Sequence, residues 1–397
     1  MERIGIFGGA FNPPHTGHVC GAQYALDAFA LDQLLVIPSC ISPHKTAPAD
    51  TPTNAQRLEM TRRAFDGIHR ITVSDAELSR GGISYTVDTL EALHTQHPQA
   101  QLFLCMGTDM FLTFQSWREY RRIAELATLA VMFRGGSGEQ EKVLEQKKCL
   151  EAMGATVCLA ENPVTEISST DLRRLISFGC VEAFLPETVA DYIRQNQLYG
   201  CGGHDRNLSM DRLEQRVVSL LKPSRIAHVL GCRDTCIALA QKWGANVTDA
   251  GRAGLLHDIT KALDGPLQLT LCRAYGTMLD DFSVHNPKTL HALTGALVAE
   301  KIFGENESVV SAIRSHTTGK ANMNLLEKIV YVADYMEPNR DFPGVEELRE
   351  LAFRDIDLAL RTGLEMTISM LRQQKKEISK ESLETLQWLD ERMNKTC

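Results

Sequence analysis

The sequence has no C-x-x-C pair, no long apolar run and no excess of basic residues. Its eleven cysteines form an odd set, and Cys232 and Cys236 stand at the spacing of one helix face. Such cysteines are typical of reduced thiols packed as small apolar groups, which excludes a disulfide framework and a zinc ribbon. No apolar run approaches about eighteen residues, and the N-terminus lacks the features of a signal peptide. We therefore expect a cytoplasmic protein with no membrane partner.

The charge balance excludes another class of partner. Forty-two basic and fifty acidic residues give a net charge of −8, so no basic excess is available to bind nucleic acid. The chain of 397 residues exceeds the usual size of one hydrophobic core, and 44% hydrophobic with 23% charged residues is ordinary for globular proteins. We expect two domains, and a homo-oligomer is compatible with this composition.

The two halves of the chain differ in their residue patterns. Residues 1–200 alternate short β-rich runs with helical patterns, which is typical of βαβ units and a parallel sheet. The glycine cluster Gly200–His204 then ends the alternation, and from about Met210 the apolar residues recur at helical spacing. The sequence predicts an α/β domain at 1–200 and an all-α domain at 208–397. The strands are expected at Arg3–Phe7, Leu34–Pro38, Ile71–Val73, Gln101–Met106, Thr128–Phe133 and Thr156–Leu159.

The first expected strand runs into a glycine-rich and histidine-rich string, Gly8–His18. Glycines at the end of a strand let backbone N–H groups approach phosphate oxygens, and the following helix presents its positive end to the same anion. His15 and His18 would share one face of the first helical turn, where two imidazoles can stabilise charge on a phosphoryl group. The alternative is that the paired histidines only cap the helix and pack.

This string resembles the H-x-G-H signature of the nucleotidyltransferase superfamily, which has a Rossmann-like fold. The second signature of that superfamily, I-S-S-T-x-x-R, stands at Ile167–Arg173. The resemblance implies that the hydroxyls of this segment cap a helix and hold triphosphate oxygens, with Arg173 supplying charge. Asn12 stands where many relatives carry an acid, and its carbonyl is still an acceptor. The nucleotide-binding residues implied are Gly8, Gly9, Phe11, Asn12, Ser168, Ser169, Thr170 and Arg173, with His15 and His18 as catalytic residues.

Three further strings are similar to nicotinate mononucleotide adenylyltransferases: Pro43–Lys45, Ser84–Thr86 and the segment from Gly107 to Trp117. The resemblance implies adenylyl transfer from ATP, carrying Mg²⁺, to nicotinate mononucleotide. Trp117 would then stack on the pyridine ring, although packing in the core is the alternative for this residue. The other acceptor-pocket and nucleotide contacts implied are His44, Lys45, Tyr85, Thr86, Asp109 and Arg134. A nucleotide-binding sensor without turnover is the alternative function.

The second half carries an ordered set of histidines and aspartates. His257 and Asp258 follow a helical pattern, and further candidate ligands lie on separate helical stretches. Five helices could therefore each deliver a ligand to one central cavity, which suits Zn, Mn or Fe with open positions for water. The candidate ligands are His228, His257, Asp258, His291, His316 and Asp334.

The order of these ligands resembles that of the HD-domain phosphohydrolases, and the strings around them are similar to bacterial symmetrical diadenosine tetraphosphate hydrolases. The resemblance implies two metals, of the kind of Fe, Mn, Co or Zn, and cleavage of diadenosine tetraphosphate to two ADP. Lys261 would assist catalysis at a phosphate, and Arg340 would bind one. His204 is interpreted as linker and His285 as loop. Hydrolysis of another nucleotide, or a metal-bound regulatory or dimerisation module, are the alternatives.

Overall fold

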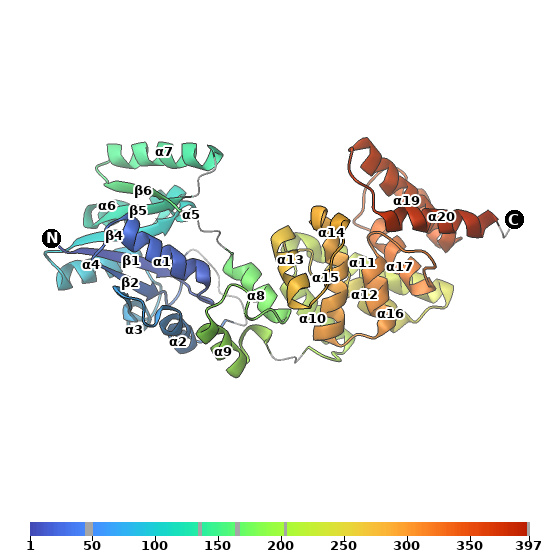
Figure 1. Cartoon of the computed structure of the whole chain (residues 1–397), viewed down its shortest axis with the longest axis horizontal. Coiled ribbons are helices and arrows are strands. Elements are labelled where there is room, and N and C mark those ends of the chain that lie inside the picture. The colour runs from blue at the N-terminus through green and yellow to red at the C-terminus, as the bar shows by residue number, and fades with distance from the viewer. Residues whose placement is uncertain (44–50, 134–136, 163–166, 202–204, 395–397) are drawn as a thin grey trace. The chain divides into compact units, whose positions relative to one another are not determined.

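The computed structural model describes residues 1–43, 51–133, 137–162, 167–201 and 205–394 (Figure 1). Its contacts divide the chain into two compact units. The first unit comprises Met1–Ser177 and Val181–Cys201, and the second comprises Phe178–Cys180 and Gly202–Cys397.

The first unit is built on one six-stranded parallel sheet. The observed strands are β1 (Arg3–Gly9), β2 (Gln33–Pro38), β3 (Ile71–Val73), β4 (Gln101–Gly107), β5 (Ala127–Phe133) and β6 (Val157–Glu161). Each lies where the alternation of residues predicts it. The expected fold class, a Rossmann-like parallel sheet followed by a helical domain, is confirmed.

The strand order β3-β2-β1-β4-β5-β6 reverses direction between β1 and β4. In open parallel sheets, ligands bind outside the carboxyl ends of the strands at such a reversal. β1 ends at Gly9 and β4 ends at Gly107, so the loops that follow these two strands emerge at this edge. The topology therefore places the Gly8–His18 string at the position where an α/β sheet binds its ligand.

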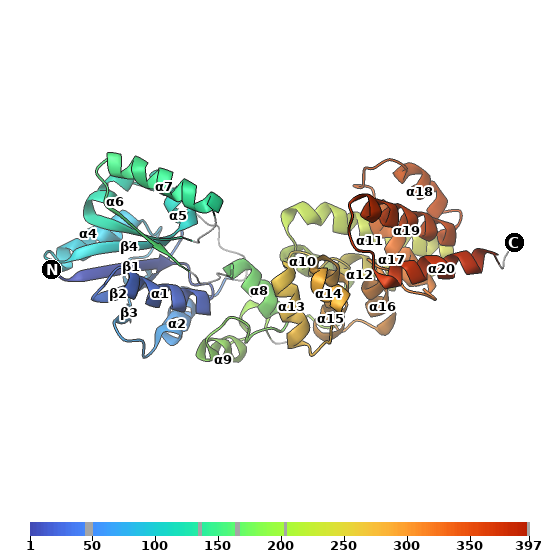
Figure 2. The ribbon, with the colours of Figure 1, turned by 45° about the horizontal axis from the view of Figure 1, so that its top comes forward.

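Helices cover both faces of this sheet (Figures 1 and 2). One core lies under α1 (Thr16–Ala28), α2 (Asn54–Phe65), α8 (Ser169–Ser177) and α9 (Glu187–Gln195). The other lies under α4 (Thr86–Gln96), α5 (Thr108–Leu112), α6 (Tyr120–Leu126) and α7 (Ser137–Ala152). The remaining short elements are α3 (Ala76–Arg80), η1 (Phe114–Ser116) and η2 (Leu198–Gly200). Because both faces are covered, the strands are apolar on both sides, as their sequences predict.

The second unit is helical throughout the part that the structure describes, from α10 to α20 (Figure 2). Among its helices, α11, α12, α15, α16 and α17 pack against one another. Close packing of α11 and α12 requires Gly254, because a Cβ there would lie 2.7 Å from the Cα of Arg233. The helices are α10 (Met210–Leu220), α11 (Pro223–Trp243), α12 (Val247–Leu256), α13 (Gly265–Ala274), α14 (Asp281–His285), α15 (Leu290–Val298), α16 (Glu307–Ser315), α17 (Leu325–Met336), α18 (Val345–Ala352), α19 (Ile356–Gln373) and α20 (Lys380–Asn394). The short elements are η3 (Pro287–Thr289) and the π-helical turn η4 (Ala299–Phe303).

His285, expected in a loop, is instead the last residue of α14, which Asp280 caps through its side chain. Over the residues described, none of the helices combines the length and the apolar character that a membrane crossing requires.

Candidate active site and metal centre

His15 and His18 cap helix α1 by binding each other's backbone. The N–H of His18 donates to Nδ1 of His15 at 3.3 Å, and the N–H of His15 donates to Nδ1 of His18 at 3.1 Å. His15 is the N-cap residue itself, just before the first turn, and the two rings lie 3.5 Å apart. Because Nδ1 accepts a hydrogen bond in each ring, the neutral imidazole carries its proton on Nε2. In each neutral ring the donor is therefore Nε2 rather than Nδ1.

His15 is buried, with 4% of its surface exposed. Burial lowers the pKa of His15 to about 4, because the imidazolium loses its hydration. The neutral ring is thus the form present near pH 7, as the acceptor role of its Nδ1 also requires. Capping and a role in charge stabilisation, which the sequence posed as alternatives, are compatible here, because they use different ring nitrogens.

The loop between β1 and α1 is held by buried side chains. Phe11 has a left-handed backbone with φ 44° and is 1% exposed, so its ring belongs to the core rather than to an open nucleotide surface. Asn12 accepts a hydrogen bond from the hydroxyl of Tyr199 at 2.7 Å, and its Nδ2 lies 3.4 Å from Oγ1 of Thr51. The Asn12 side chain is therefore engaged within the protein by both of its polar atoms.

The second signature begins helix α8. Ser168 caps the helix, since its Oγ accepts from the N–H of Asp171 at 3.0 Å. Ser169 and Thr170 lie in the first turn, and Oγ1 of Thr170 accepts from Arg173 at 3.1 Å. Arg173 also donates to the backbone oxygen of Asn12 at 2.8 Å. This contact brings the two signature segments, far apart in the sequence, into one site.

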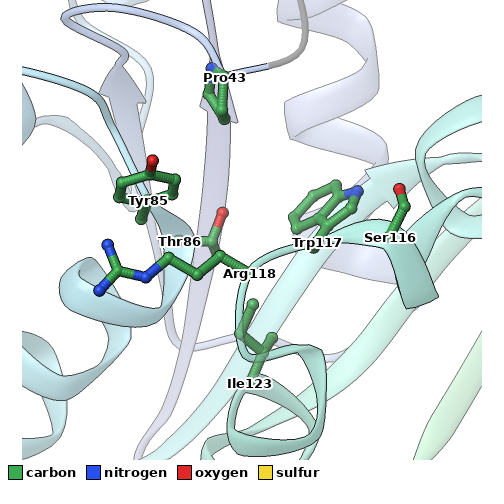
Figure 3. Close-up of a pocket in the computed structure, with 7 residues that line it drawn as sticks. All are labelled: Pro43, Tyr85, Thr86, Ser116, Trp117, Arg118 and Ile123. Carbon is green, nitrogen blue, oxygen red and sulfur yellow. The ribbon is translucent and has the colours of Figure 1, made fainter.

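The first unit also has a cavity of about 270 Å³, and Figure 3 shows the residues that line it. Tyr85 and Thr86, at the start of α4, face Trp117, which follows η1. The guanidinium of Arg118 stacks on the ring of Tyr85, with 4.4 Å between Cζ and the ring centroid. The cavity therefore has aromatic walls and one charged lining residue among those described. The lining residues are Pro43, Tyr85, Thr86, Ser116, Trp117, Arg118 and Ile123.

Some predicted residues are not brought together with this cavity. Asp109 lies exposed on α5 and lines neither this cavity nor the second described one, which includes Thr51 and Tyr199. Gly8 and Gly9 form the end of β1, and a Cβ at Gly9 would lie 3.2 Å from the ring of Phe11. His44, Lys45, Arg134 and His204 lie outside the described residues.

The six candidate metal ligands of the second unit converge around Asp258, which is 0% exposed. Its Oδ2 lies 3.5 Å from Nε2 of His228 and 3.6 Å from Nε2 of His257. Its Oδ1 lies 3.4 Å from Nε2 of His291 and 3.8 Å from Nε2 of His316. Asp258 thus belongs to two three-residue groups, one at each carboxylate oxygen. Each of the two groups could hold a metal ion.

Asp334 completes the first of these groups. Its Oδ1 lies 3.1 Å from Nε2 of His228 and 3.7 Å from Nε2 of His257. His228 lies on α11, His291 on α15 and Asp334 on α17, whereas His257 and His316 are the residues that follow the last turns of α12 and α16. The candidate ligands therefore come from five helices or from the residue that follows one, and two of them, His257 and His316, lie just beyond the helix ends.

All four histidines are oriented through Nδ1. These nitrogens lie 2.6–3.1 Å from oxygens that can only accept, so each Nδ1 carries a proton and each Nε2 can present its lone pair to a metal. The acceptors are Glu337 for His228, Gly254 for His257, Lys288 for His291 and Ile313 for His316. Orientation of this kind is typical of metal ligands.

The donor set fits divalent metals of the transition series. The Oδ1 atom of Asp258 is buried and has no hydrogen-bond partner among the described residues. Burial opposes ionisation of Asp258 and Asp334, but the surrounding histidines outweigh it and hold the pKa of both carboxyls well below the usual range. Burial also lowers the pKa of His291 to about 3 and of His316 to about 4. At His228, burial is outweighed by Asp258 and Asp334, which raise the pKa to about 9, and at His257 the neighbouring Cys232, Asp258 and Asp334 do the same, so a metal that binds these two rings displaces protons. Ionised carboxylates and neutral imidazoles are the forms that bind such metals.

Three cations surround this centre. Arg225 donates to Oδ2 of Asp258 at 2.6 Å, and Arg340 donates to Oδ1 of Asp334 at 2.7 Å. Lys261 lies in a turn after α12 rather than on a helix, and its Nζ is 3.8 Å from Oδ1 of Asp258 and 2.8 Å from Nε2 of His291. Both predicted phosphate-binding residues, Lys261 and Arg340, therefore lie next to the candidate ligands.

Sequence reasoning missed several residues of these sites. Arg225 stands three residues before His228, and Glu337 three residues after Asp334, so helical spacing from a predicted ligand could have found both. In the first unit, Arg57 interrupts the apolar stripe of α2, and a cation on a buried stripe is a signal in itself. Arg118 and Tyr199 gave no such signal, because their contacts depend on the fold.

The fold and the two sites define a class of protein: a nucleotidyltransferase domain followed by an HD domain. A family model described as cytidylyltransferase-like matches residues 6–175, and the HD-domain model matches residues 225–339.

Named relatives narrow the class. A probable nicotinate-nucleotide adenylyltransferase of Gemmatimonas aurantiaca is 36% identical over 198 residues, which are 50% of this chain and 92% of the relative. One from Desulfitobacterium hafniense is 37% identical over 199 residues, covering 50% of this chain and 96% of the relative. Through its first half, the chain belongs to the nicotinate-nucleotide adenylyltransferase family.

Two solved structures are similar to part of this chain. A crystal structure described as a predicted HD superfamily hydrolase involved in NAD metabolism, from Clostridium acetobutylicum, shares 37% identity. It covers 47% of this chain and 98% of its own, with a TM-score of 0.46. Nicotinic acid mononucleotide adenylyltransferase of Plasmodium falciparum, complexed with NaAD, matches 51% of this chain and 99% of its own at 18% identity and a TM-score of 0.43.

Proposed function

We propose that the first unit transfers the adenylyl group of ATP to nicotinate mononucleotide. A phosphate oxygen of the mononucleotide attacks the α-phosphorus of ATP in line, and the bond from that phosphorus to the oxygen of the β-phosphate breaks. The products are deamido-NAD and pyrophosphate. The observation that carries this proposal is the meeting of His15, His18 and Arg173 around the Ala10–Asn12 loop, in a chain of this family. ATP enters as its Mg²⁺ complex.

The roles follow from the tautomers that the cap requires. Because Nδ1 of His15 and of His18 accepts a hydrogen bond in the cap, the N–H donor of each neutral ring is on Nε2, and we assign these donors to the charge that develops on the phosphates. The first turn of α8, with Ser169 and Thr170, adds hydroxyls and the positive end of a helix. No covalent intermediate is required, so catalysis consists of positioning two anions and stabilising the leaving pyrophosphate.

The cavity with Tyr85 and Trp117 is proposed as the acceptor site. Its aromatic walls suit a pyridine ring, and Arg118, the charged residue among its described linings, suits a carboxylate better than a carboxamide. We expect a clear preference for nicotinate over nicotinamide mononucleotide, and a raised KM for nicotinate mononucleotide in Trp117→Ala.

The test measures kcat/KM of the full chain with both acceptors. Leu112→Ala, an exposed residue of α5 that does not line the cavity, is the matched control and should behave as the unaltered chain. Equal efficiency with the two acceptors would show that the acceptor assignment is wrong.

We further propose that the second unit hydrolyses a nucleotide with a phosphoanhydride chain, and that diadenosine tetraphosphate is the substrate, giving two ADP. The support is the pair of three-residue groups that share Asp258, together with cationic side chains beside them. Two divalent ions, of the kind of Fe, Mn, Co or Zn, would be held by His228, His257, Asp258, His291, His316 and Asp334. When bound, they would supply the Lewis acidity for hydrolysis.

Arg225, Lys261 and Arg340 are assigned to the substrate phosphates, because their charges lie beside the ligand groups and phosphates are the anions they would meet. There are two rival functions, which predict different outcomes. One is hydrolysis of another nucleotide, and the other is a metal-bound regulatory or dimerisation module, which forms no product.

Chromatography of the products that the metal-loaded full chain forms from diadenosine tetraphosphate decides between them. ADP alone supports central cleavage, whereas equal amounts of AMP and ATP contradict it. No cleavage with Mn²⁺, Fe²⁺ or Co²⁺ favours the regulatory module. Lys261→Ala should slow turnover while the metal content stays unchanged, since Lys261 is a phosphate ligand in this proposal.

We also propose that the protein works in the cytoplasm. The cysteines that the structure describes are all free thiols. Free thiols suit a reducing compartment.

A further inference from the structure

A buried arginine joins the loops that would bind the two substrates of the first unit. Arg57 lies on the buried stripe of α2, one turn before Met60, and is 4% exposed. Its Nη1 donates to the backbone oxygen of Ala10 at 2.6 Å. Its Nη2 donates to the backbone oxygens of Ser39 at 2.7 Å and of Cys40 at 3.2 Å. One guanidinium thus spans the loop after β1 and the loop after β2.

The bonding of Arg57 differs from that of an ordinary buried arginine. Its acceptors are three backbone carbonyls and the amide oxygen of Asn54, at 2.6 Å, and no described carboxylate forms an ion pair with it. In the second unit, Arg252 instead pairs with the buried carboxylate of Glu305 through two contacts of 2.6 and 2.7 Å. Burying a cation without a carboxylate partner costs free energy. Ion pairing therefore does not explain why Arg57 is buried between the two loops.

Each loop held by Arg57 leads to a different substrate. Ala10 precedes Asn12, whose backbone oxygen is held by Arg173, and the chain then continues to the His15 cap. On the other side, the N–H of Cys40 donates to Oγ of Ser84 at 2.8 Å.

The contact continues to the acceptor cavity. The N–H of Ser84 donates to the backbone oxygen of Ile41 at 2.9 Å, and Ser84 directly precedes Tyr85 in the cavity wall. A continuous path of hydrogen bonds therefore runs from the nucleotide loop, through one guanidinium, to the acceptor cavity.

We propose that Arg57 is a positioning residue that sets the distance between the acceptor phosphate and the α-phosphorus of ATP. This inference rests on the proposed adenylyl transfer. The planar fork of the guanidinium fixes the carbonyls of Ala10 and Ser39 relative to each other, which a single ammonium does not. Each substrate can still bind to its own loop without this link. The hydrogen bonds of Arg57 instead align the two substrates with each other, and a misplacement of the reacting atoms by about 1 Å costs about 100-fold in rate.

The experiment compares Arg57→Ala, Arg57→Gln and Arg57→Lys in the full chain. We expect kcat for deamido-NAD formation to fall about 100-fold in Arg57→Ala and Arg57→Gln, while the Kd of a non-hydrolysable ATP analogue and the KM of the acceptor change little. Arg57→Lys keeps the charge but lacks the fork, so it should stay well below the unaltered chain. Guanidinium ion at millimolar concentration should partly restore Arg57→Ala, and ammonium at equal ionic strength should not.

Met60→Ala is the matched control, because Met60 is fully buried on the same stripe and takes no part in the hydrogen-bonded path. It should lower thermal stability and leave kcat of the folded protein nearly unchanged. The proposal would be overturned if kcat fell in proportion to the folded fraction both in Met60→Ala and in the Arg57 variants. Full activity of Arg57→Lys would also overturn it. If Arg57→Ala does not fold, Arg57→Gln carries the same test. Absence of deamido-NAD with the unaltered chain would instead refute the proposed function.

Discussion

A histidine can cap a helix and still present a donor, because in the neutral ring one nitrogen accepts while the other carries the proton. Substitution can separate these roles at His15. Asn is a good N-cap residue, so His15→Asn should keep the hydrogen bond to the N–H of His18 while removing the Nε2 donor. We expect adenylyl transfer to fall about 10²–10³-fold with little change in melting temperature.

His15→Ala loses the cap as well, and should in addition lower the free energy of unfolding by about 1 kcal/mol. Initial rates and thermal melts of both variants make the comparison. A His15→Asn variant with normal activity would show that the pair only caps.

The protonation of His15 gives a second prediction at this scale. Burial lowers its pKa to about 4, so the ring should stay neutral from pH 8 down to about pH 5. The folded state then binds fewer protons at this site than the unfolded chain does. The contribution of His15 to stability is therefore complete above pH 6.5 and is lost as the pH falls toward 4.

Histidine ring NMR of the full chain measures this directly. The resonance that disappears in His15→Asn should not titrate above about pH 5. A midpoint near 6.5 would mean that the ring is hydrated and accessible, contrary to its burial.

At the scale of elements, Gly231 on α11 and Gly254 on α12 leave space for different neighbours, a side chain and a helix backbone. A Cβ at Gly231, on α11, would lie 2.4 Å from Oε2 of Glu337, the residue whose other oxygen holds Nδ1 of His228. A Cβ at Gly254, on α12, would meet the backbone of α11 instead. A side chain can move away, whereas a helix backbone cannot do so without unpacking.

We therefore expect Gly231→Ala to fold and to bind metal about 10–100-fold more weakly, since it displaces a carboxylate that orients a ligand. Glu337→Gln should act in the same direction. Gly254→Ala should lower the melting temperature markedly. Metal titration followed by elemental analysis, with Glu346→Gln as an exposed control, measures the first effect. Unchanged metal affinity in both Gly231→Ala and Glu337→Gln would contradict the role given to Glu337.

At the scale of the whole molecule, the chain carries two sets of reactive residues that share no member. The adenylyl-transfer residues fall within the first compact unit, and all six candidate metal ligands fall within the second. Asp258→Ala should therefore abolish hydrolysis and metal binding while deamido-NAD synthesis continues. His15→Asn should lower deamido-NAD synthesis while hydrolysis and metal binding continue. Both rates are measured on each full-length variant, and loss of both activities in one folded variant would contradict the two-site proposal.

The sequence predicted most of the fold because each strand is a short apolar run between helical patterns. In a parallel sheet covered on both faces, local pattern and burial agree, so the expected strands need little correction. Side chains decided some elements that the pattern did not predict, as at His285, where the N-cap Asp280 begins a short separate helix, α14, in an expected loop. Lys261, which the resemblance placed at a phosphate, lies in a turn after α12, and the tertiary fold brings its ammonium to 3.8 Å from Oδ1 of Asp258.

What the sequence by itself determined is the fold class and which residues are candidates for the two sites. The H-x-G-H string is local, and the histidines and aspartates of the second half stand in the order that resembles an HD domain, so residue type and order were enough to select these candidates. What only the tertiary structure decided is how those groups are held. Asp258 offers one oxygen to each histidine pair, and Arg57 bonds carbonyls from two loops, because strands and helices distant in sequence meet there. Backbone carbonyls carry no sequence signal, since every residue has one, and only folding selects which of them a buried side chain can reach.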